Sequence, residues 1–181
     1  MRLNVNNNMI QILNGFEKWE FGIAHLLLQN ENLFKLLRYE DGDALSRLID
    51  AEIMEDMIYE YDSRGNRNPN CRIFFRKFTG DTEETQRSQL RIYPLRVKPS
   101  NIYYGDMLFQ VDVIVHMGID KIRNGQRRHR LASEIIQSLN GQEIGMVQSV
   151  VIQDAFMFDS SRHPQYDGWS LIFSTGVAVS G

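Results

Sequence analysis

The feature that most constrains the fold is the alternating stretch MLFQVDVIVHM at residues 107–117. One set of alternating side chains is apolar, whereas the other set includes Gln110, Asp112 and His116. A period of two over this length is typical of a β-strand with one face buried against a core. The chain is therefore expected to form a sheet with one apolar face, which another layer of structure must cover.

Patterns on both sides of this strand give the expected order of elements. Apolar residues at helical spacing predict two N-terminal helices, the first divided by the polar stretch QNEN. Asp43 is the expected N-cap of the second helix, Pro94 confines its strand to an edge or a bulge, and Gly141 ends the later helix. The expected elements are helices over 17–40 and 41–62, strands over 71–78, 89–99 and 107–117, a helix within 124–141, and strands over 146–158 and 169–179.

This order predicts an α+β fold. A mostly antiparallel sheet with one helix packed on it, in the order β-β-β-α-β-β, follows the two N-terminal helices. The chain is expected to divide into a mobile, Asn-rich arm over 1–16, a helical, acidic region over 17–62 and an α+β core over 63–181.

Charge is unevenly distributed along the chain. Residues 40–62 carry nine acidic side chains and one basic side chain, whereas residues 63–98 carry nine basic and three acidic ones. Such segregation is typical either of two solvated faces or of complementary electrostatics between neighbouring copies.

Composition narrows the class of protein. A chain of 181 residues can bury a core of its own, and a net charge of -3 argues against binding polyanions over the whole surface. The single cysteine, Cys71, excludes an internal disulfide and fits a reducing compartment. No apolar run is long enough to span a bilayer, and the N-terminus has no signal-peptide pattern, so we expect a protein made inside a cell with no membrane partner.

Basic residues crowd the start of the helix expected within residues 124–141. Arg127, Arg128 and Arg130 stand in its first turn, where the helix dipole disfavours cations, and Arg123 lies just before it. We therefore expect a negative partner, which is DNA phosphate, the acidic segment of the same chain, or that segment on a neighbouring copy. A plain solvated surface is the other interpretation. The acidic candidates for this contact are Asp50, Glu52, Glu55 and Asp56.

The sequence carries no recognisable catalytic or metal-binding motif. It has no phosphate loop, no nucleophile elbow and no dinucleotide fingerprint, and its histidines fall in different predicted elements without metal-ligand spacing. Asp112 and His116 would lie ~13 Å apart along a strand, too far for a hydrogen bond. Cys71 begins a predicted strand and is expected to be a packing residue. We therefore expect no enzyme activity, no cofactor and no metal.

From Tyr104 onwards, the sequence resembles a family of phage proteins. The stretches FQVDVIVH, IIQSLNG and GWSLIFS match a strand of the form x-V-D-V-x-V, a helix that ends in I-x-x-L-x-G, and a final apolar, aromatic strand. These features resemble the tail-terminator proteins of long-tailed bacteriophages, also called tail-completion or head-to-tail joining proteins. The resemblance covers residues 71–98 loosely and does not cover the N-terminal helices.

The resemblance implies a structural virion protein of the tail or neck, assembled in the host cytoplasm. A homo-oligomeric ring, six-fold in the known family, would cap the tail tube, end tail polymerisation and join the tail to the head. The implied partners are the tail tube protein, a neck or head-completion protein and, in a contractile tail, the sheath. Genomic DNA would pass through the lumen without sequence-specific binding.

A ring of this kind needs two different, complementary patches on each subunit. The acidic region and the basic cluster are the expected patches. Tyr103, Tyr104 and Trp169 are candidate anchors, and packing in the core of the monomer is the other role open to each. Two alternatives remain, namely a head-completion or neck adaptor protein and a small nucleic-acid-binding protein that uses the Arg123–Arg130 cluster.

Overall fold

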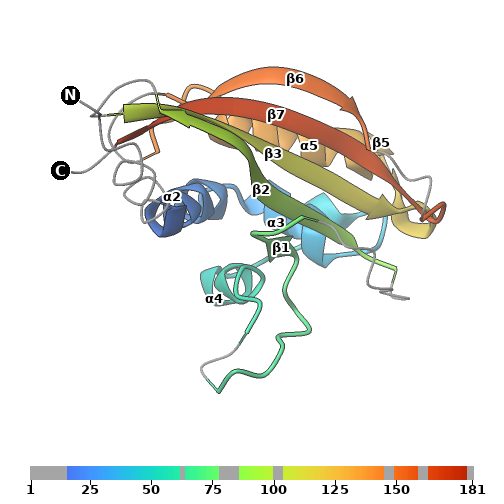
Figure 1. Cartoon of the computed structure of the whole chain (residues 1–181). Coiled ribbons are helices and arrows are strands. Elements are labelled where there is room, and N and C mark those ends of the chain that lie inside the picture. The colour runs from blue at the N-terminus through green and yellow to red at the C-terminus, as the bar shows by residue number, and fades with distance from the viewer. Residues whose placement is uncertain are drawn as a thin grey trace, which may run out of the picture.

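The central feature of the molecule is a five-stranded sheet with the order β1-β2-β3-β7-β6 (Figure 1). β1 runs parallel to β2, and the other neighbouring strands are antiparallel. A computed structural model describes residues 16–61, 64–77, 86–99, 104–144, 149–158 and 163–178. The strands are β1 (Ile73–Phe74), β2 (Ser88–Pro99), β3 (Tyr104–His116), β6 (Val151–Met157) and β7 (Tyr166–Ala178), and β4 (Lys121–Ile122) pairs with β5 (Gly125–Gln126) in a separate ribbon.

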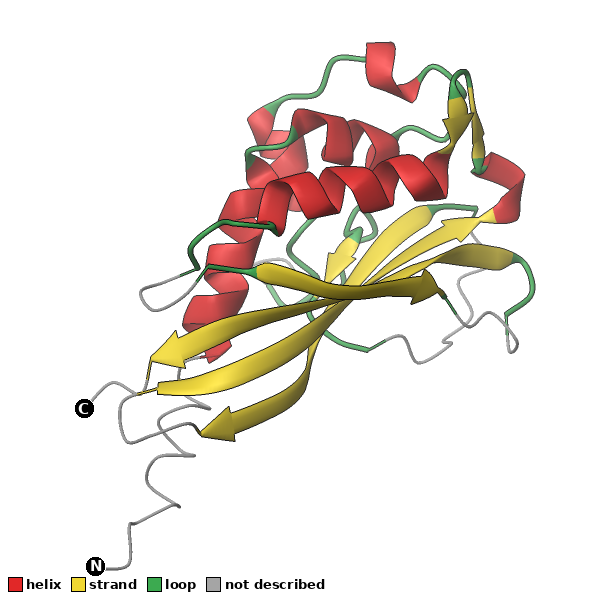
Figure 2. Ribbon diagram, turned by 90° about the horizontal axis from the view of Figure 1, so that it is seen from above, coloured by secondary structure: helices red, strands yellow, loops and turns green. Residues whose placement is uncertain are grey.

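The longer helices lie together on one side of this sheet (Figure 2). They contribute apolar side chains to one cluster with β2, β3 and β7, and the Trp19 ring meets the Phe109 ring edge-on at 5.2 Å. We call this side of the sheet the inner face and the opposite side the outer face. The helices are α2 (Phe16–Leu28), α3 (Glu31–Arg38), α4 (Ala51–Asp56) and α5 (Arg127–Leu139), with the 3-10 turns η1 (Ala44–Ser46) and η2 (Met117–Ile119).

The alternation predicted for residues 107–117 is confirmed along β3. Met107, Phe109, Val111, Val113 and Val115 have no exposed surface and face the helices. Residue 117 leaves the pattern because the chain turns there into η2, and its side chain is 59% exposed. The apolar half of the alternation thus marks the inner face.

The outer face is held by polar contacts instead. The Asp112 carboxylate accepts hydrogen bonds from the Tyr93 hydroxyl at 2.8 Å, the Gln110 amide at 2.6 Å and the Ser170 hydroxyl at 2.6 Å. Burial and then the neighbouring Asp112 raise the pKa of Tyr93 above its usual value, so its hydroxyl remains a donor. This network satisfies a carboxylate that is almost fully buried.

Two residues set local features of the sheet. The register of β2 against β3 shifts between Pro94 and Arg96, so the predicted bulge is confirmed. Gly168 in β7 lies against β3 so closely that a Cβ there would stand 1.7 Å from the Val113 carbonyl oxygen. Only glycine fits at that crossing.

The prediction of one long helix over residues 41–62 is wrong. The chain instead forms η1, an extended stretch and the short helix α4. Asp50 accepts a hydrogen bond from the Ile53 amide at 2.8 Å and so caps a new helix, whereas Asp43 precedes η1 without a side-chain cap. Leu48, expected in the apolar stripe of the helix, is 90% exposed.

The predicted fold class is confirmed. The structure has the order β-β-β-α-β-β for β1, β2, β3, α5, β6 and β7, with helical segments before it, and the expected first helix is divided into α2 and α3. The strand expected over 71–78 is only two residues long in the described part. One cluster of buried residues extends from Trp19 in α2 to Phe173 in β7, so the N-terminal helices share their core with the sheet.

Candidate subunit-contact site

Arg127, the first residue of α5, is fully buried. Its Nε donates to the Ile119 carbonyl at 2.9 Å, and its Nη1 donates to the carbonyls of Leu36 at 2.6 Å and Tyr39 at 2.5 Å. Its Nη2 donates to the Asp41 carbonyl at 2.8 Å. Burial lowers the pKa of Arg127, although nearby carboxylates, Asp41 first, act in the opposite direction.

This placement corrects the expected intermolecular role of Arg127. A side chain with no exposed surface does not reach another protomer. Three of the four acceptors come from the C-terminal end of α3 and the chain just after it, where the helix dipole favours a cation, and the fourth is the Ile119 carbonyl of η2. The guanidinium therefore joins α3, the start of the acidic segment and η2 to the start of α5.

Arg128 also finds its counter-charges within the chain. It forms ion pairs with Asp120 at 2.9 Å and with Asp167 at 2.7 Å, and its side chain is 17% exposed. Asp120 accepts a hydrogen bond from the Arg128 amide at 3.0 Å as well. A carboxylate at the first turn of α5 thus compensates for the unfavourable position of the arginines in the helix dipole.

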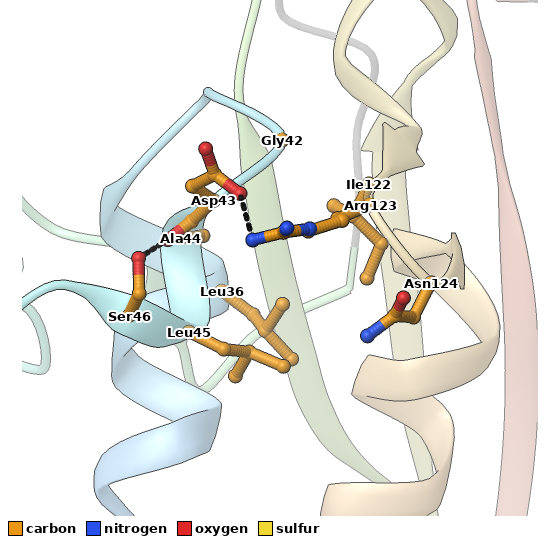
Figure 3. Close-up of a pocket in the computed structure, with 9 residues that line it drawn as sticks. All are labelled: Leu36, Gly42, Asp43, Ala44, Leu45, Ser46, Ile122, Arg123 and Asn124. Carbon is orange, nitrogen blue, oxygen red and sulfur yellow. Dashed lines mark hydrogen bonds and ion pairs between the residues drawn. The ribbon is translucent and has the colours of Figure 1, made fainter.

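Arg123 lies at the edge of a pocket of about 320 Å³ between η1 and the β4–β5 ribbon (Figure 3). Its amide donates to the Gly42 carbonyl at 3.0 Å, and its guanidinium lies 3.8 Å from the Asp43 carboxylate. Both side chains of this ion pair are largely exposed. The basic cluster and the first part of the acidic segment therefore meet inside one protomer, which was one of the open alternatives.

Arg130 pairs along its own helix. Its Nε lies 2.9 Å from Glu134, one turn later in α5, and its side chain is 46% exposed. Glu134 is buried and also accepts a hydrogen bond from the Asn30 amide at 3.0 Å, which links α5 to the start of α3. Arg130 and Arg123 are the two arginines of the predicted cluster that retain large exposed surfaces.

The four acidic candidates lie on or beside α4, away from the basic cluster (Figure 1). Each is exposed. Asp50 caps α4, and Asp56 accepts hydrogen bonds from the Asn68 amide at 2.9 Å and the Asn70 amide at 2.8 Å. Glu52 and Glu55 face solvent in this protomer, so the structure does not bring these acids to Arg123–Arg130.

The aromatic candidates have different positions. Trp169 is partly buried on the inner face, and its Nε1 donates to His129 Nδ1 at 2.8 Å. Its role within the protomer is therefore to connect β7 with the first turn of α5. Tyr104 begins β3, and neither its side chain nor Tyr103 is among the described parts.

Three arginines of the basic segment 63–98 are buried, whereas Arg64, Arg67, Lys77, Arg96 and Lys98 are exposed. Arg72, Arg87 and Arg91 are at least nine-tenths buried, and the Arg91 guanidinium lies 3.7 Å from the centre of the Phe74 ring. Burial lowers the pKa of Arg87 and Arg91 to about 10. Arg87 immediately precedes β2, and Gln89 and Arg91 follow it on the same face. This spacing does not distinguish buried from solvated arginines, so the sequence held no signal for their burial.

Sequence reasoning did not identify the exposed edge of the sheet. Val151, Phe156 and Met157 of β6 are 46%, 43% and 49% exposed. The predicted strand was located well, but its pattern carries no alternation that separates a buried face from an exposed one. Its place at the end of the sheet order decides the exposure.

Within the described ranges, no group of three His, Cys, Asp or Glu side chains is arranged to hold a metal ion. The helices of the same ranges include none with both the length and the apolar composition of a membrane span.

The fold and this surface define an α+β protein whose charged clusters are used mainly for its own packing. The chain belongs to the YomW family, since the model of that family matches residues 30–175. The family is phage-derived, and the chain is therefore a phage-related protein. The match begins at the cap of α3 and includes α4, so it covers the acidic segment as well as the sheet. A search of curated proteins found no match.

Proposed function

We propose that this chain is a structural protein of a phage particle that assembles into a ring at the end of the tail tube. In this role it ends tail polymerisation and joins the tail to the head or neck. A head-completion or neck adaptor protein is the alternative with the same architecture. Membership of a phage-derived family and the sequence resemblance to tail terminators support the proposal.

The observation that carries the proposal is the surface of β6. The strand is the last of the sheet, six of its seven residues are exposed, and three of those six are large apolar side chains. Monomeric proteins usually protect such an edge with charges, proline or a covering helix. β6 carries one charged residue, Asp154, with a register shift beside it, but no described strand covers its outer edge. A strand with three exposed apolar side chains fits a protein that buries this strand on assembly.

The contacts of the charged clusters argue against the nucleic-acid-binding alternative. Arg127 is enclosed, Arg128 is paired with two carboxylates, and Arg123 and Arg130 each have an acidic neighbour. A Lys or Arg side chain that binds a phosphate gains affinity because it releases a counterion from the nucleic acid. A side chain already paired with a carboxylate contributes less to this binding.

The proposal is tested by the mass and shape of the purified full chain. We expect light scattering to give a multiple of the 21.1 kDa protomer, and electron microscopy to show rings. Phe156→Ser, which removes an apolar side chain from β6, is expected to lower the assembled fraction. Leu48→Ser removes an exposed apolar side chain from a site far from that edge and serves as the matched control.

A chain that stays monomeric over a wide range of concentration and salt would contradict the proposal, provided that no rings form when isolated tail tubes are added. Equal loss of assembly in the Phe156 and Leu48 variants would also contradict it.

A further inference from the structure

We infer that two copies of this chain join by pairing the β6 edge of one copy with the β2 edge of the next, so that the sheet continues from subunit to subunit. The inference rests on the proposed ring and identifies its seam, which is the contact between neighbouring subunits. The partner at each edge is a second copy of this chain, and three properties of the two edges support this.

The first property is that, among the described residues, both edges of the sheet are open. β6 pairs with β7 and with no other described strand. On the far side, β1 pairs with only two residues of β2, Leu90 and Arg91. No described strand covers residues 92–99 of β2, and Pro94, Leu95, Arg96 and Lys98 are exposed there.

The second property is charge on one common face. Directly opposed residues of antiparallel strands point to the same face of a sheet. Asp154 of β6 is opposite Ile172, which is opposite Gln110, so Asp154 points to the outer face. Arg96 of β2 is opposite Leu108, and this side of the sheet is again the outer face.

We consider the β6 edge of one copy paired with the β2 edge of the next, with their outer faces forming one surface. In this arrangement Asp154 of one copy stands beside Arg96 of the next. Lys98 lies two residues beyond Arg96 and points to the same face, where it adds to this attraction. The exposed apolar side chain of Phe156 would then lie near Leu95, which is 45% exposed on the β2 edge.

The third property is strand direction. β2, β3, β7 and β6 alternate in direction, so β6 runs antiparallel to β2. A neighbouring copy in a similar orientation presents its β2 antiparallel to this β6, which continues the alternation. Head-to-tail contact between two different edges is also the kind that closes a ring.

Symmetric pairing of two β6 strands is the competing arrangement. β6 extends from Val151 to Met157, and its central residue is Asp154. A full-length antiparallel pair of identical strands places Asp154 opposite Asp154, and like charges directly opposite destabilise a sheet. The strand is therefore better suited to the basic β2 edge than to itself.

Cysteine cross-linking of the full chain tests the seam. The native Cys71 is buried, and burial raises its pKa to about 11, so it contributes little background reaction. We expect the double variant Asp154→Cys with Arg96→Cys, treated with a short bismaleimide, to give a ladder of linked protomers. Each single variant is expected to give none, and Glu31→Cys with Arg96→Cys is the control pair, since Glu31 lies on α3.

Charge reversal gives a second measurement that does not depend on cross-linking geometry. Asp154→Arg is expected to raise the dissociation constant of assembly about tenfold. Adding Arg96→Asp to this variant is expected to restore most of the lost affinity between subunits. Glu31→Arg makes the same charge change at another exposed acid and is expected to leave assembly unchanged.

The outcomes separate the seam from the ring. An oligomer that gives no ladder and no charge-reversal effect overturns the seam and leaves the proposed ring standing. Dimers from Asp154→Cys alone overturn the seam in favour of symmetric β6 pairing. Protein that neither assembles nor cross-links at any concentration, with or without isolated tail tubes, overturns both proposals.

Discussion

Arg127 shows how one residue can reverse the interpretation of a cluster. The helix dipole correctly indicates that arginines at the start of α5 need negative partners. The partners of Arg127 are backbone carbonyls inside the protomer, at 2.5–2.9 Å, and no other subunit is needed to satisfy it. The sequence contained a sign of this, because Arg127 stands four residues before Leu131 and eight before Ile135, in the buried stripe of the helix.

We expect Arg127→Met to lower the free energy of unfolding by about 3 kcal/mol or more, because it leaves buried carbonyls of three segments without a donor. Urea denaturation followed by circular dichroism measures this. Arg123→Met is the matched control from the same cluster, since both side chains of its ion pair with Asp43 are largely exposed and the pair is expected to contribute no more than about 1 kcal/mol. Equal losses for the two variants would contradict the assigned role of Arg127.

At the scale of elements, close approach of β3 and β7 gives the sharpest prediction. Gly168→Ala places a Cβ 1.7 Å from the Val113 carbonyl oxygen, so the two central strands must separate or shift. We expect a loss of several kcal/mol or failure to fold, measured by thermal unfolding. Gly42→Ala is the control, because its nearest described neighbour is 3.8 Å away. A stable Gly168 variant would show that the strands are less closely fitted than described here.

Elements with a long, regular period were predictable from the sequence. β3 alternates over its whole length and α5 keeps its apolar residues one turn apart, so both were located correctly. The segment 41–62 was not, because it contains two acidic residues able to precede a helix and the chain uses the later one, Asp50, as the side-chain cap. Helical periodicity alone does not distinguish one long helix from a turn followed by a short one.

Contacts between distant segments were not predictable from local pattern. Charge counts indicated that the acidic and basic segments attract, and the structure brings Asp43 and Arg123 together within one protomer. The acids of α4 remain separate from that pair, because the chain between η1 and α4 is extended and carries them away. Composition gives the sign of an interaction, whereas topology decides which residues make it.

At the scale of the whole molecule, a sheet with all its long helices on one side has a core on one face and open backbone at its two ends. The order β1-β2-β3-β7-β6 puts β2 and β6 on opposite sides of β3 and β7. Sequence analysis supplied the strands but not this order. The β6 edge follows from the order, and the open part of β2 follows from the shortness of β1.

The distance between these edges has a genetic consequence. In the proposed ring, a copy damaged at β6 would keep a sound β2 edge, so it would still attach to one neighbour but would offer no binding edge to the next. In mixtures with the wild type, we expect Asp154→Arg copies to leave arcs of subunits that fail to close, out of proportion to their share of the population. This effect is measured by titrating the variant into the wild type and counting closed rings by electron microscopy. A number of closed rings that falls only in proportion to the fraction of variant subunits would argue against it.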